Sequence, residues 1–284
     1  MLKIIKQLLK PTRLWRYNLG GKKPWSTGYD EYRWSMIKES TTNIGLLQMV
    51  KEGKLPANYG LRMDDRVVEY PWIFAQLSTA KTKMLDAGST FNFPELVSHP
   101  VIMEKDFSIF TFYPETTNYS QNRISYLYGD LREMPFKDAY FDEVVCQSTI
   151  EHIDMDNSIY GYDLSRTDTK QPKSYSYLGA VSELYRVTKP GGMLLISFPY
   201  GKFENHGFFQ QFDSEMVGKL KSELQEKGTL TETYFLYKQD GWHFSTAKEA
   251  NEAESYNPHT GVGKGTDGAA HCRSICCIRF DKTT

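Results

Sequence analysis

The sequence predicts an α/β fold in which a largely parallel sheet is covered by helices. Four short apolar runs, each long enough for a strand buried on both faces, span residues 84–87, 107–112, 141–146 and 193–198. Helix-compatible stretches separate them. In the stretch at 177–187, Ala180, Val181, Leu184 and Val187 recur at the three- and four-residue spacing of an amphipathic helix. Strands that alternate with helices in this way are typical of a parallel sheet.

Length and composition favour a globular enzyme and exclude a tail or a linker. The chain has 284 residues, of which 40% are hydrophobic and 24% charged, and its net charge is −1. The strand-bearing part shows no basic stripe with interleaved aromatic residues, so we do not expect nucleic acid as a partner. No run of about twenty apolar residues predicts a membrane span.

The four cysteines predict reduced thiols. None of the pairs has the two-residue gap of a zinc knuckle or redox motif, and Cys276 and Cys277 point to opposite faces of an expected strand. His271 stands beside Cys272, but no second ligand pair at metal spacing follows, so we expect no metal. Reduced thiols predict a cytoplasmic protein.

The N-terminus is the one strongly charged segment. Seven lysines and arginines precede the first acid, Asp30, and Leu2, Ile5, Leu8 and Leu9 share one helical face. Two interpretations stay open. The helix packs on its own domain with solvated lysines, or residues 1–23 lie at the inner membrane face as a peripheral contact.

We expect two parts in the chain. Residues 1–80 form a helical and aromatic cap, and their tryptophans, which are Trp15, Trp25, Trp34 and Trp72, predict packing onto the main domain. Residues 81–284 form that domain, with further strands at 233–237 and 274–280.

Two insertions interrupt the main domain. The first, 154–177, carries Tyr160, Tyr162, Tyr175 and Tyr177, and is compatible with a substrate lid or with a solvated loop. The second, 202–232, contains an expected helix at 213–227 with Asp213 or Ser214 as its N-cap.

Three segments place chemistry at the ends of strands. In LDAGS a strand ends at Asp86 and the chain turns at Gly88 into a helix that Pro94 can begin. In YGDLREMPF a carboxylate, Asp130, precedes apolar residues that can cover an adenine ring. In RVTKPGG a helix ends at Lys189 and residues 190–192 turn the chain into the next strand. These loops should meet at the carboxyl ends of the strands.

Together these segments resemble class I S-adenosylmethionine (SAM) dependent methyltransferases of the small-molecule branch, over roughly residues 84–201. The resemblance implies a Rossmann-like, doubly wound, mostly parallel seven-stranded sheet with an antiparallel last strand, and SAM as cofactor. The strings LDAGSTFN and STIEHIDMDN also resemble a bacterial subgroup of unassigned substrate, some members of which accompany cell-surface polysaccharide genes.

The resemblance also implies roles for individual residues. It assigns the methionine end of SAM to the first loop and adenine to the loop at Asp130. Glu115 is the nearest acid to the ribose position after the second strand. Because Gly88 is followed by Ser89, Thr90, Phe91 and Asn92 in place of further glycines, Ser89 or Asn92 side chains would supply hydrogen bonds. The expected cofactor-binding residues are Asp86, Gly88, Ser89, Asn92, Glu115, Asp130, Leu131, Gln147 and Ser148.

Glu151 and His152 are the candidate catalytic residues. His152 could deprotonate a hydroxyl nucleophile, or the two side chains could orient the loop by hydrogen bonding. The sequence thus predicts methyl transfer to an oxygen of a small molecule or glycan precursor, with a nitrogen as the less favoured acceptor. The alternatives are a non-catalytic Rossmann-like adaptor and a nicotinamide-dependent oxidoreductase, although the latter would need a GxGxxG loop that is absent after the first strand.

Overall fold

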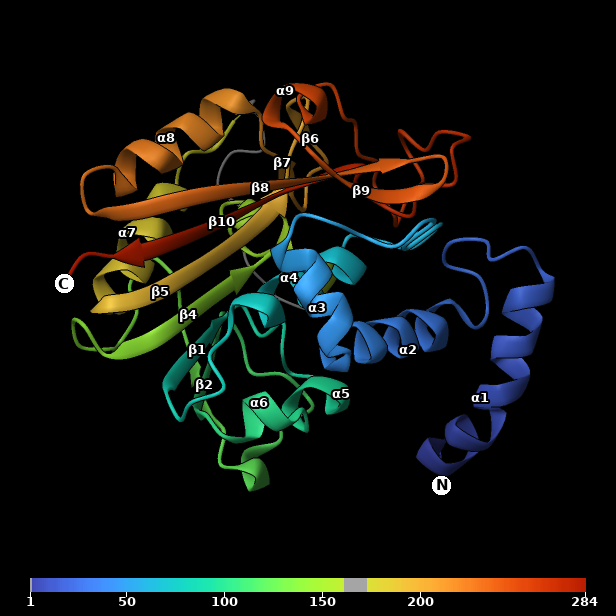
Figure 1. The fold of residues 1–284 in the computed structure, drawn as a ribbon, viewed down its shortest axis with the longest axis horizontal. Coiled ribbons are helices and arrows are strands. Elements are labelled where there is room, and N and C mark those ends of the chain that lie inside the picture. Colours follow the sequence, from blue (N-terminus) through green and yellow to red (C-terminus); the bar gives the residue numbers. More distant parts are fainter. Residues whose placement is uncertain (1, 161–172) are drawn as a thin grey trace.

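A single mixed sheet forms the centre of the molecule (Figure 1). The computed structural model describes residues 2–160 and 173–284, so most of the predicted insertion at 154–177 lies outside the described residues. The sheet has eight strands in the order β3-β2-β1-β4-β5-β10-β8-β9. Their bounds are β1 Lys83–Ala87, β2 Asp106–Thr111, β3 Ser125–Tyr128, β4 Phe141–Gln147, β5 Thr188–Pro199, β8 Gly228–Lys238, β9 Gly241–Ser245 and β10 Ser274–Lys282.

The predicted fold class is confirmed. Strands β1 to β5 pair in parallel, and the order reverses between β1 and β4, which is the switch point where ligands bind in open α/β sheets. β10 inserts antiparallel between β5 and β8. The described sheet holds eight strands, one more than expected, because the chain after β8 turns back into the antiparallel hairpin strand β9.

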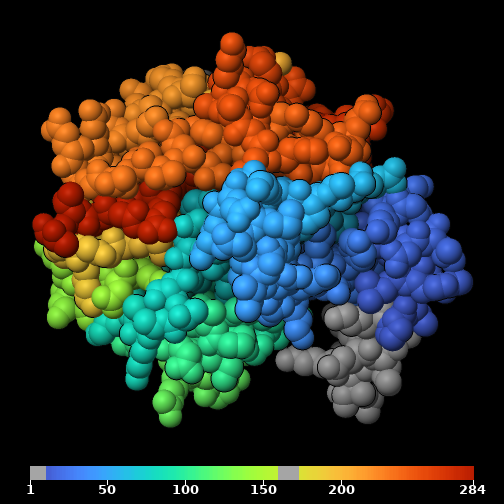
Figure 2. Space-filling model, viewed as in Figure 1, coloured from blue at the N-terminus to red at the C-terminus, as the bar shows by residue number. Residues whose placement is uncertain are grey.

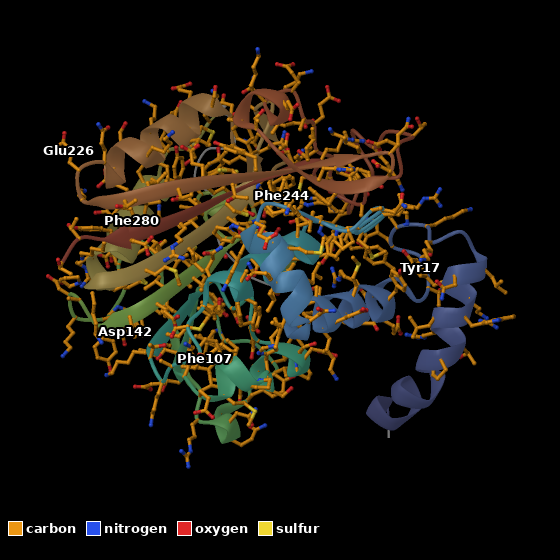
Figure 3. The ribbon with its side chains drawn as sticks, viewed as in Figure 1. Tyr17, Phe107, Asp142, Glu226, Phe244 and Phe280 are labelled. Carbon is orange, nitrogen blue, oxygen red and sulfur yellow. The ribbon has the colours of Figure 1, made fainter. Side chains whose placement is uncertain are left out.

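Helices cover both faces of the sheet. One buried cluster joins α2 and α4 to the face that carries Met84, Phe107 and Cys277. The other joins α7 and α8 to the face that carries Leu85, Cys276 and Phe280. Phe107 and Phe280 are labelled in Figure 3. Neighbouring residues of one strand thus enter different clusters, as the period of two requires, and the opposite facing of the vicinal cysteines is confirmed. All four cysteines are free and buried.

The helices and the shorter elements complete the fold. The helices are α1 Leu2–Leu19, α2 Tyr29–Thr42, α3 Ile44–Lys51, α4 Arg66–Gln76, α5 Pro94–Val97, α6 Pro100–Met103, α7 Tyr177–Val187, α8 Ser214–Leu224 and α9 Ala247–Ala250. The shorter elements are the 3₁₀ turns η1 Ser120–Asn122, η2 Ile150–His152 and η3 Asn157–Tyr160, and a small second sheet of β6 Glu204–Asn205 and β7 Gln210–Gln211.

Several local predictions are confirmed. α7 has the bounds that its apolar spacing predicts, and Pro94 begins α5. Asp213 is the N-cap of α8, where its side chain accepts a hydrogen bond from the Met216 N–H. α8 ends at Leu224, three residues short of the expected end.

The KPGG segment does not form the expected turn between helix and strand. α7 ends at Val187 and β5 begins at Thr188, which pairs with Phe141, while Met193 pairs with Glu143. Residues 189–192 therefore bulge within the strand, and Gly191 takes a φ of 73° there. The early pairing of Thr188 with β4 ends the helix sooner than the sequence indicates.

The N-terminal helices lie against one flank of the sheet, as the blue surface in Figure 2 shows. Trp72 is buried and Trp34 packs against Tyr70 and Phe93. The expected packing is wrong for Trp15, which is 63% exposed, because α1 lies at the periphery of the molecule (Figure 1). Among the described residues no helix combines the length and apolar character that crossing a bilayer requires. Membrane contact of residues 1–23 stays a prediction, which liposome flotation of a chain starting at Lys22 would test.

Candidate active site

The loops that follow β1, β2, β3 and β4 all leave the sheet at its carboxyl edge, because these strands are parallel. Every residue that the sequence assigned to cofactor binding or catalysis stands at the end of one of these strands or in the loop after it. The fold therefore brings together, at one edge, residues as distant in the chain as Asp86 and His152.

Gly88 occupies a position that only glycine fits. Its φ is +131°, and a Cβ placed there would lie 2.0 Å from Thr149 Oγ1. The Gly88 N–H donates to the carbonyl of Phe110 at 2.8 Å, which ties the β1 loop to β2. The first glycine loop therefore packs directly against the loop after β4, and one glycine is enough for this close approach.

Asp86 organises the glycine loop from within. Its carboxylate accepts hydrogen bonds from Thr90 N at 3.2 Å, Thr90 Oγ1 at 3.1 Å and Phe91 N at 2.8 Å. The side chain is fully buried, and burial, which outweighs these bonds, raises its pKa from an ordinary 3.8 to about 7. Asp86 thus holds residues 90–91 in the shape of the loop, which is an indirect way to serve a cofactor.

This pKa predicts a pH-dependent stability. Below pH about 4 Asp86 is protonated in both states, whereas between pH about 4 and about 7 only the folded state keeps the proton. Stability is therefore lost as the pH rises through this window, by up to about 4 kcal/mol. Urea denaturation of wild type and Asp86→Asn from pH 4 to 8 measures the effect. We expect a smaller decline in the variant, and equal slopes would contradict the assignment.

Ser89 and Asn92 contribute differently from each other. Ser89 has a positive φ of 64°, and its buried Oγ has no hydrogen-bond partner among the described residues, so it is available to a ligand. Asn92 Nδ2 donates to Glu115 Oε2 at 2.5 Å and to Thr117 O at 2.9 Å, and its Oδ1 accepts from Tyr126 OH at 2.8 Å. The structure thus places exposed Glu115, the candidate ribose acid, beside the glycine loop.

Asp130 lies at the end of β3 in close contact with Arg132. Asp130 Oδ1 accepts from the Arg132 N–H at 2.8 Å and Nε at 2.9 Å, and Oδ2 accepts from Nη2 at 2.6 Å. Burial would raise the pKa of Asp130, but these bonds outweigh it and hold the pKa below its usual range. The carboxylate is ionised and oriented, and the next residue, Leu131, is buried.

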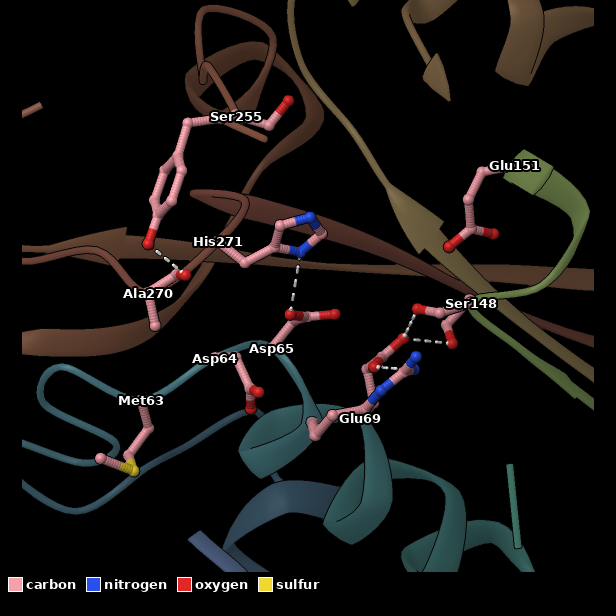
Figure 4. A network of polar contacts seen from close by, with 12 residues as sticks. Met63, Asp64, Asp65, Glu69, Ser148, Glu151, Ser255, Ala270 and His271 are labelled. Atoms are coloured by element: carbon pink, nitrogen blue, oxygen red, sulfur yellow. Dashed lines mark hydrogen bonds and ion pairs between the residues drawn. The ribbon is translucent and has the colours of Figure 1, made fainter. Parts of the chain in front are cut away.

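Glu69 of α4 connects the N-terminal helices to this edge. Its Oε1 accepts from Ser148 Oγ and Ser197 Oγ, both at 2.6 Å. Its Oε2 accepts from Arg66 Nη1 at 2.8 Å and Gln147 Nε2 at 3.2 Å. Figure 4 shows Glu69 bonded to Ser148. Together with the bond to Gln147, this contact anchors the end of β4.

The sequence prediction missed Glu69 and Arg66. The other partners of Glu69 are Gln147 at the end of β4, Ser148 directly after it and Ser197 in β5, so no local motif marks this pair. One signal was present: Glu69 is a single carboxylate within the apolar run RVVEYPWIFA, and all residues from Val67 to Ala75 are buried. A buried charge in such a run requires polar partners elsewhere in the fold.

His152 is held in one tautomer. Its Nδ1 lies 2.7 Å from the carbonyl oxygen of Phe208, which can only accept, so Nδ1 carries the proton and Nε2 the lone pair. Burial, with smaller effects of Arg66 and His271, lowers its pKa to about 4. The imidazole is therefore neutral near pH 7 and offers Nε2 as an acceptor.

Glu151 faces the same region from η2. Its Oε1 lies 3.9 Å from His152 Nε2, and its buried Oε2 has no hydrogen-bond partner among the described residues. Burial raises its pKa well above the ordinary value. A buried carboxyl group beside a neutral imidazole can orient a hydroxyl group.

Comparisons with known proteins agree with this geometry. A family model described as a methyltransferase domain matches residues 112–196, which include the loops after β2, β3 and β4. No curated protein matches the chain.

Several solved structures align with much of the chain at low sequence identity. 1,6-Didemethyltoxoflavin-N1-methyltransferase from Burkholderia thailandensis, solved with that compound and S-adenosylhomocysteine, is 11% identical, with 72% of each chain covered and a TM-score of 0.43. A SAM-dependent methyltransferase from Thermotoga maritima is 13% identical, with 88% of this chain and all of that chain covered and a TM-score of 0.43. One from Methanosarcina mazei is 10% identical, with 75% and 98% covered and a TM-score of 0.42.

The domain match and the strand order define the class of this protein. It is a methyltransferase that uses SAM as its cofactor. The predictions of enzyme class and cofactor are confirmed, so neither the nicotinamide-dependent oxidoreductase nor the adaptor is retained.

Proposed function

We propose that the protein transfers the methyl group of SAM to an oxygen of a small molecule or glycan precursor and releases S-adenosylhomocysteine. The main support is the convergence at one sheet edge of the glycine loop, the Asn92–Glu115 pair, Asp130 and the segment from Gln147 to His152. This is the edge where a ligand binds in such a sheet.

In this proposal three loops hold the cofactor. Gly88 and Ser89 contact its methionine end, with Asp86 fixing the loop behind them. Glu115 binds the ribose hydroxyls, and Asn92 orients its carboxylate. Asp130 accepts the adenine amine and Leu131 covers the ring, while Gln147 and Ser148 line the approach to the methyl group. These roles rest on each residue's position and on its contacts.

A hydroxyl acceptor fits the polar groups after β4. Gln147 Oε1 and Glu151 Oε2 are buried and have no partner among the described residues. Both oxygens can accept a hydrogen bond: one is an amide carbonyl oxygen and the other belongs to a carboxyl group. The hydroxyl group of an acceptor molecule would donate that hydrogen bond. Methyl transfer is an in-line displacement, so the main requirement on the site is to align the acceptor oxygen with the sulfonium methyl group.

Calorimetry with S-adenosylhomocysteine tests the cofactor site. We expect wild type to bind and Asp130→Ala to bind at least about tenfold more weakly, since a hydrogen bond to a charged group contributes about 1.5–3 kcal/mol. Asp138→Ala is the matched control, because Asp138 lies in the same connection but is 80% exposed and pairs with Arg186. Equal affinity of Asp130→Ala and wild type would remove the adenine role, and no binding by folded wild type would overturn the proposed site.

The acceptor is tested separately with labelled SAM. Sugars, nucleotide sugars and small phenols are incubated with the full-length protein, and label transfer is measured by mass spectrometry of the product. We expect an alkali-stable methyl ether on one of these classes. A product methylated on nitrogen, or label transfer only to amines, would contradict O-methylation and leave the cofactor site in place.

A further inference from the structure

The start of α4 meets the segment before β10 close to the carboxyl end of β5. Asp65 is the N-cap residue of α4, and His271 and Cys272 shortly precede β10, whose Ile275 pairs with Pro199. Asp65 makes no side-chain capping hydrogen bond, unlike most N-cap acids. Its Oδ1 instead lies 3.5 Å from His271 Nδ1, as Figure 4 shows.

We propose that Asp65, His271 and Cys272 form a binding site for one divalent metal ion, best matched by Zn²⁺. Each residue offers one ligand atom, and the three atoms lie within 4.8 Å of one another. Zinc binds carboxylate oxygen, imidazole nitrogen and thiolate sulfur at about 2.0–2.3 Å, so neighbouring ligands of a tetrahedral site stand about 3.5 Å apart. Side-chain rotations that bring the atoms together by about 1 Å close the site.

Charge and burial favour a cation at this point. Asp65 is 4% exposed and Cys272 is 1% exposed. The Asp65 side chain is therefore a buried oxygen donor, and its Oδ1 lies 3.5 Å from the His271 ring nitrogen Nδ1. With Zn²⁺, one carboxylate, one thiolate and one neutral imidazole, the site has no net charge. The Cys272 thiol releases its proton to solvent as the metal binds.

The charged residues around the cluster are already paired with one another. Arg66, the residue after Asp65, is paired with Glu69 at 2.8 Å, and Asp64 is paired with Arg33 at 2.6 Å. Two buried atoms on the same side have no partner among the described residues, His271 Nε2 and Glu151 Oε2. Glu151 is 2% exposed and its carboxyl group points toward this network in Figure 4.

Three protein ligands leave a fourth position open, as in catalytic zinc sites. That position would face the edge of β4 and β5, where water or an oxygen of the acceptor can bind. The metal site itself needs no cofactor and does not depend on the proposed function.

Cobalt titration of the chelator-treated, full-length protein tests the site. Co²⁺ reports a thiolate ligand by a charge-transfer absorption in the near ultraviolet. We expect one Co²⁺ per chain and displacement by Zn²⁺. Cys272→Ser should abolish the charge-transfer band, and Asp65→Asn and His271→Ala should weaken Co²⁺ binding more than about tenfold. Cys277→Ser is the control, since this thiol is buried in β10 outside the cluster and should leave the band unchanged.

Two results would overturn the site: folded wild type that binds no Co²⁺, or a charge-transfer band that survives Cys272→Ser. If Cys272→Ser does not fold, thermal unfolding provides a second test. Zn²⁺ should raise the melting temperature of wild type and leave that of Asp65→Asn unchanged. Calorimetry with S-adenosylhomocysteine on metal-free protein distinguishes failure of the metal site from failure of the cofactor site.

Discussion

Replacing Glu69 by alanine is expected to lower the free energy of unfolding by about 3 kcal/mol. The carboxylate accepts from two serine hydroxyls, one amide and the guanidinium of Arg66. Without it, three buried donors lose their acceptor, and Arg66, which is 27% exposed, loses its counter-ion. Chemical denaturation with urea measures the loss.

Two variants control this result. Glu69→Gln keeps the shape and one acceptor oxygen, so it should cost less than the alanine variant. Glu52→Ala removes an exposed carboxylate on the same N-terminal segment and should leave the stability close to that of wild type. A Glu69→Ala protein as stable as the Glu52→Ala protein would show that α4 is held to the sheet by its apolar contacts alone.

Gly88→Ala should both destabilise the protein and weaken S-adenosylhomocysteine binding more than about tenfold. The added methyl group would lie 2.0 Å from Thr149 Oγ1 and 2.7 Å from its Cγ2, so the loops after β1 and β4 would have to separate. Overpacking of this kind costs about 1–3 kcal/mol, and the φ of +131° adds backbone strain. Urea denaturation and calorimetry measure the two effects.

Gly53→Ala separates strain from contact, because Gly53 has a φ of +71° and nothing within 4 Å of its added Cβ. It should lose only about 1–2 kcal/mol and keep its cofactor affinity. Thr149→Ala removes the two nearest atoms, so the double variant with Gly88→Ala should recover part of the stability. Wild-type affinity in Gly88→Ala would mean that this loop does not contact the cofactor.

Local patterns predicted much of the fold. The spacing of Ala180, Val181, Leu184 and Val187 predicted α7, and apolar runs predicted six strands, because these signals arise from neighbours in the chain. β3 and β9 were missed. β3 is only partly buried and lies at the edge of the sheet, so its sequence carries a weak apolar signal. β9 is defined by its pairing with β8.

The candidate site, like the fold, has features that the sequence predicts and contacts that only the structure shows. By itself the sequence determined which loops carry the chemistry, since Asp86, Gly88 and the segment at Glu151 follow recognisable strands and Asp130 stands in a recognisable loop motif, YGDLREMPF. Only the tertiary structure decided which residues those loops contact. Glu69 accepts a hydrogen bond from Ser148, and Thr149 packs against Gly88. Asp65 lies beside His271 and Cys272. These contacts join residues distant in the chain, and no local periodicity encodes them. Packing of α4 and β10 on the sheet creates them.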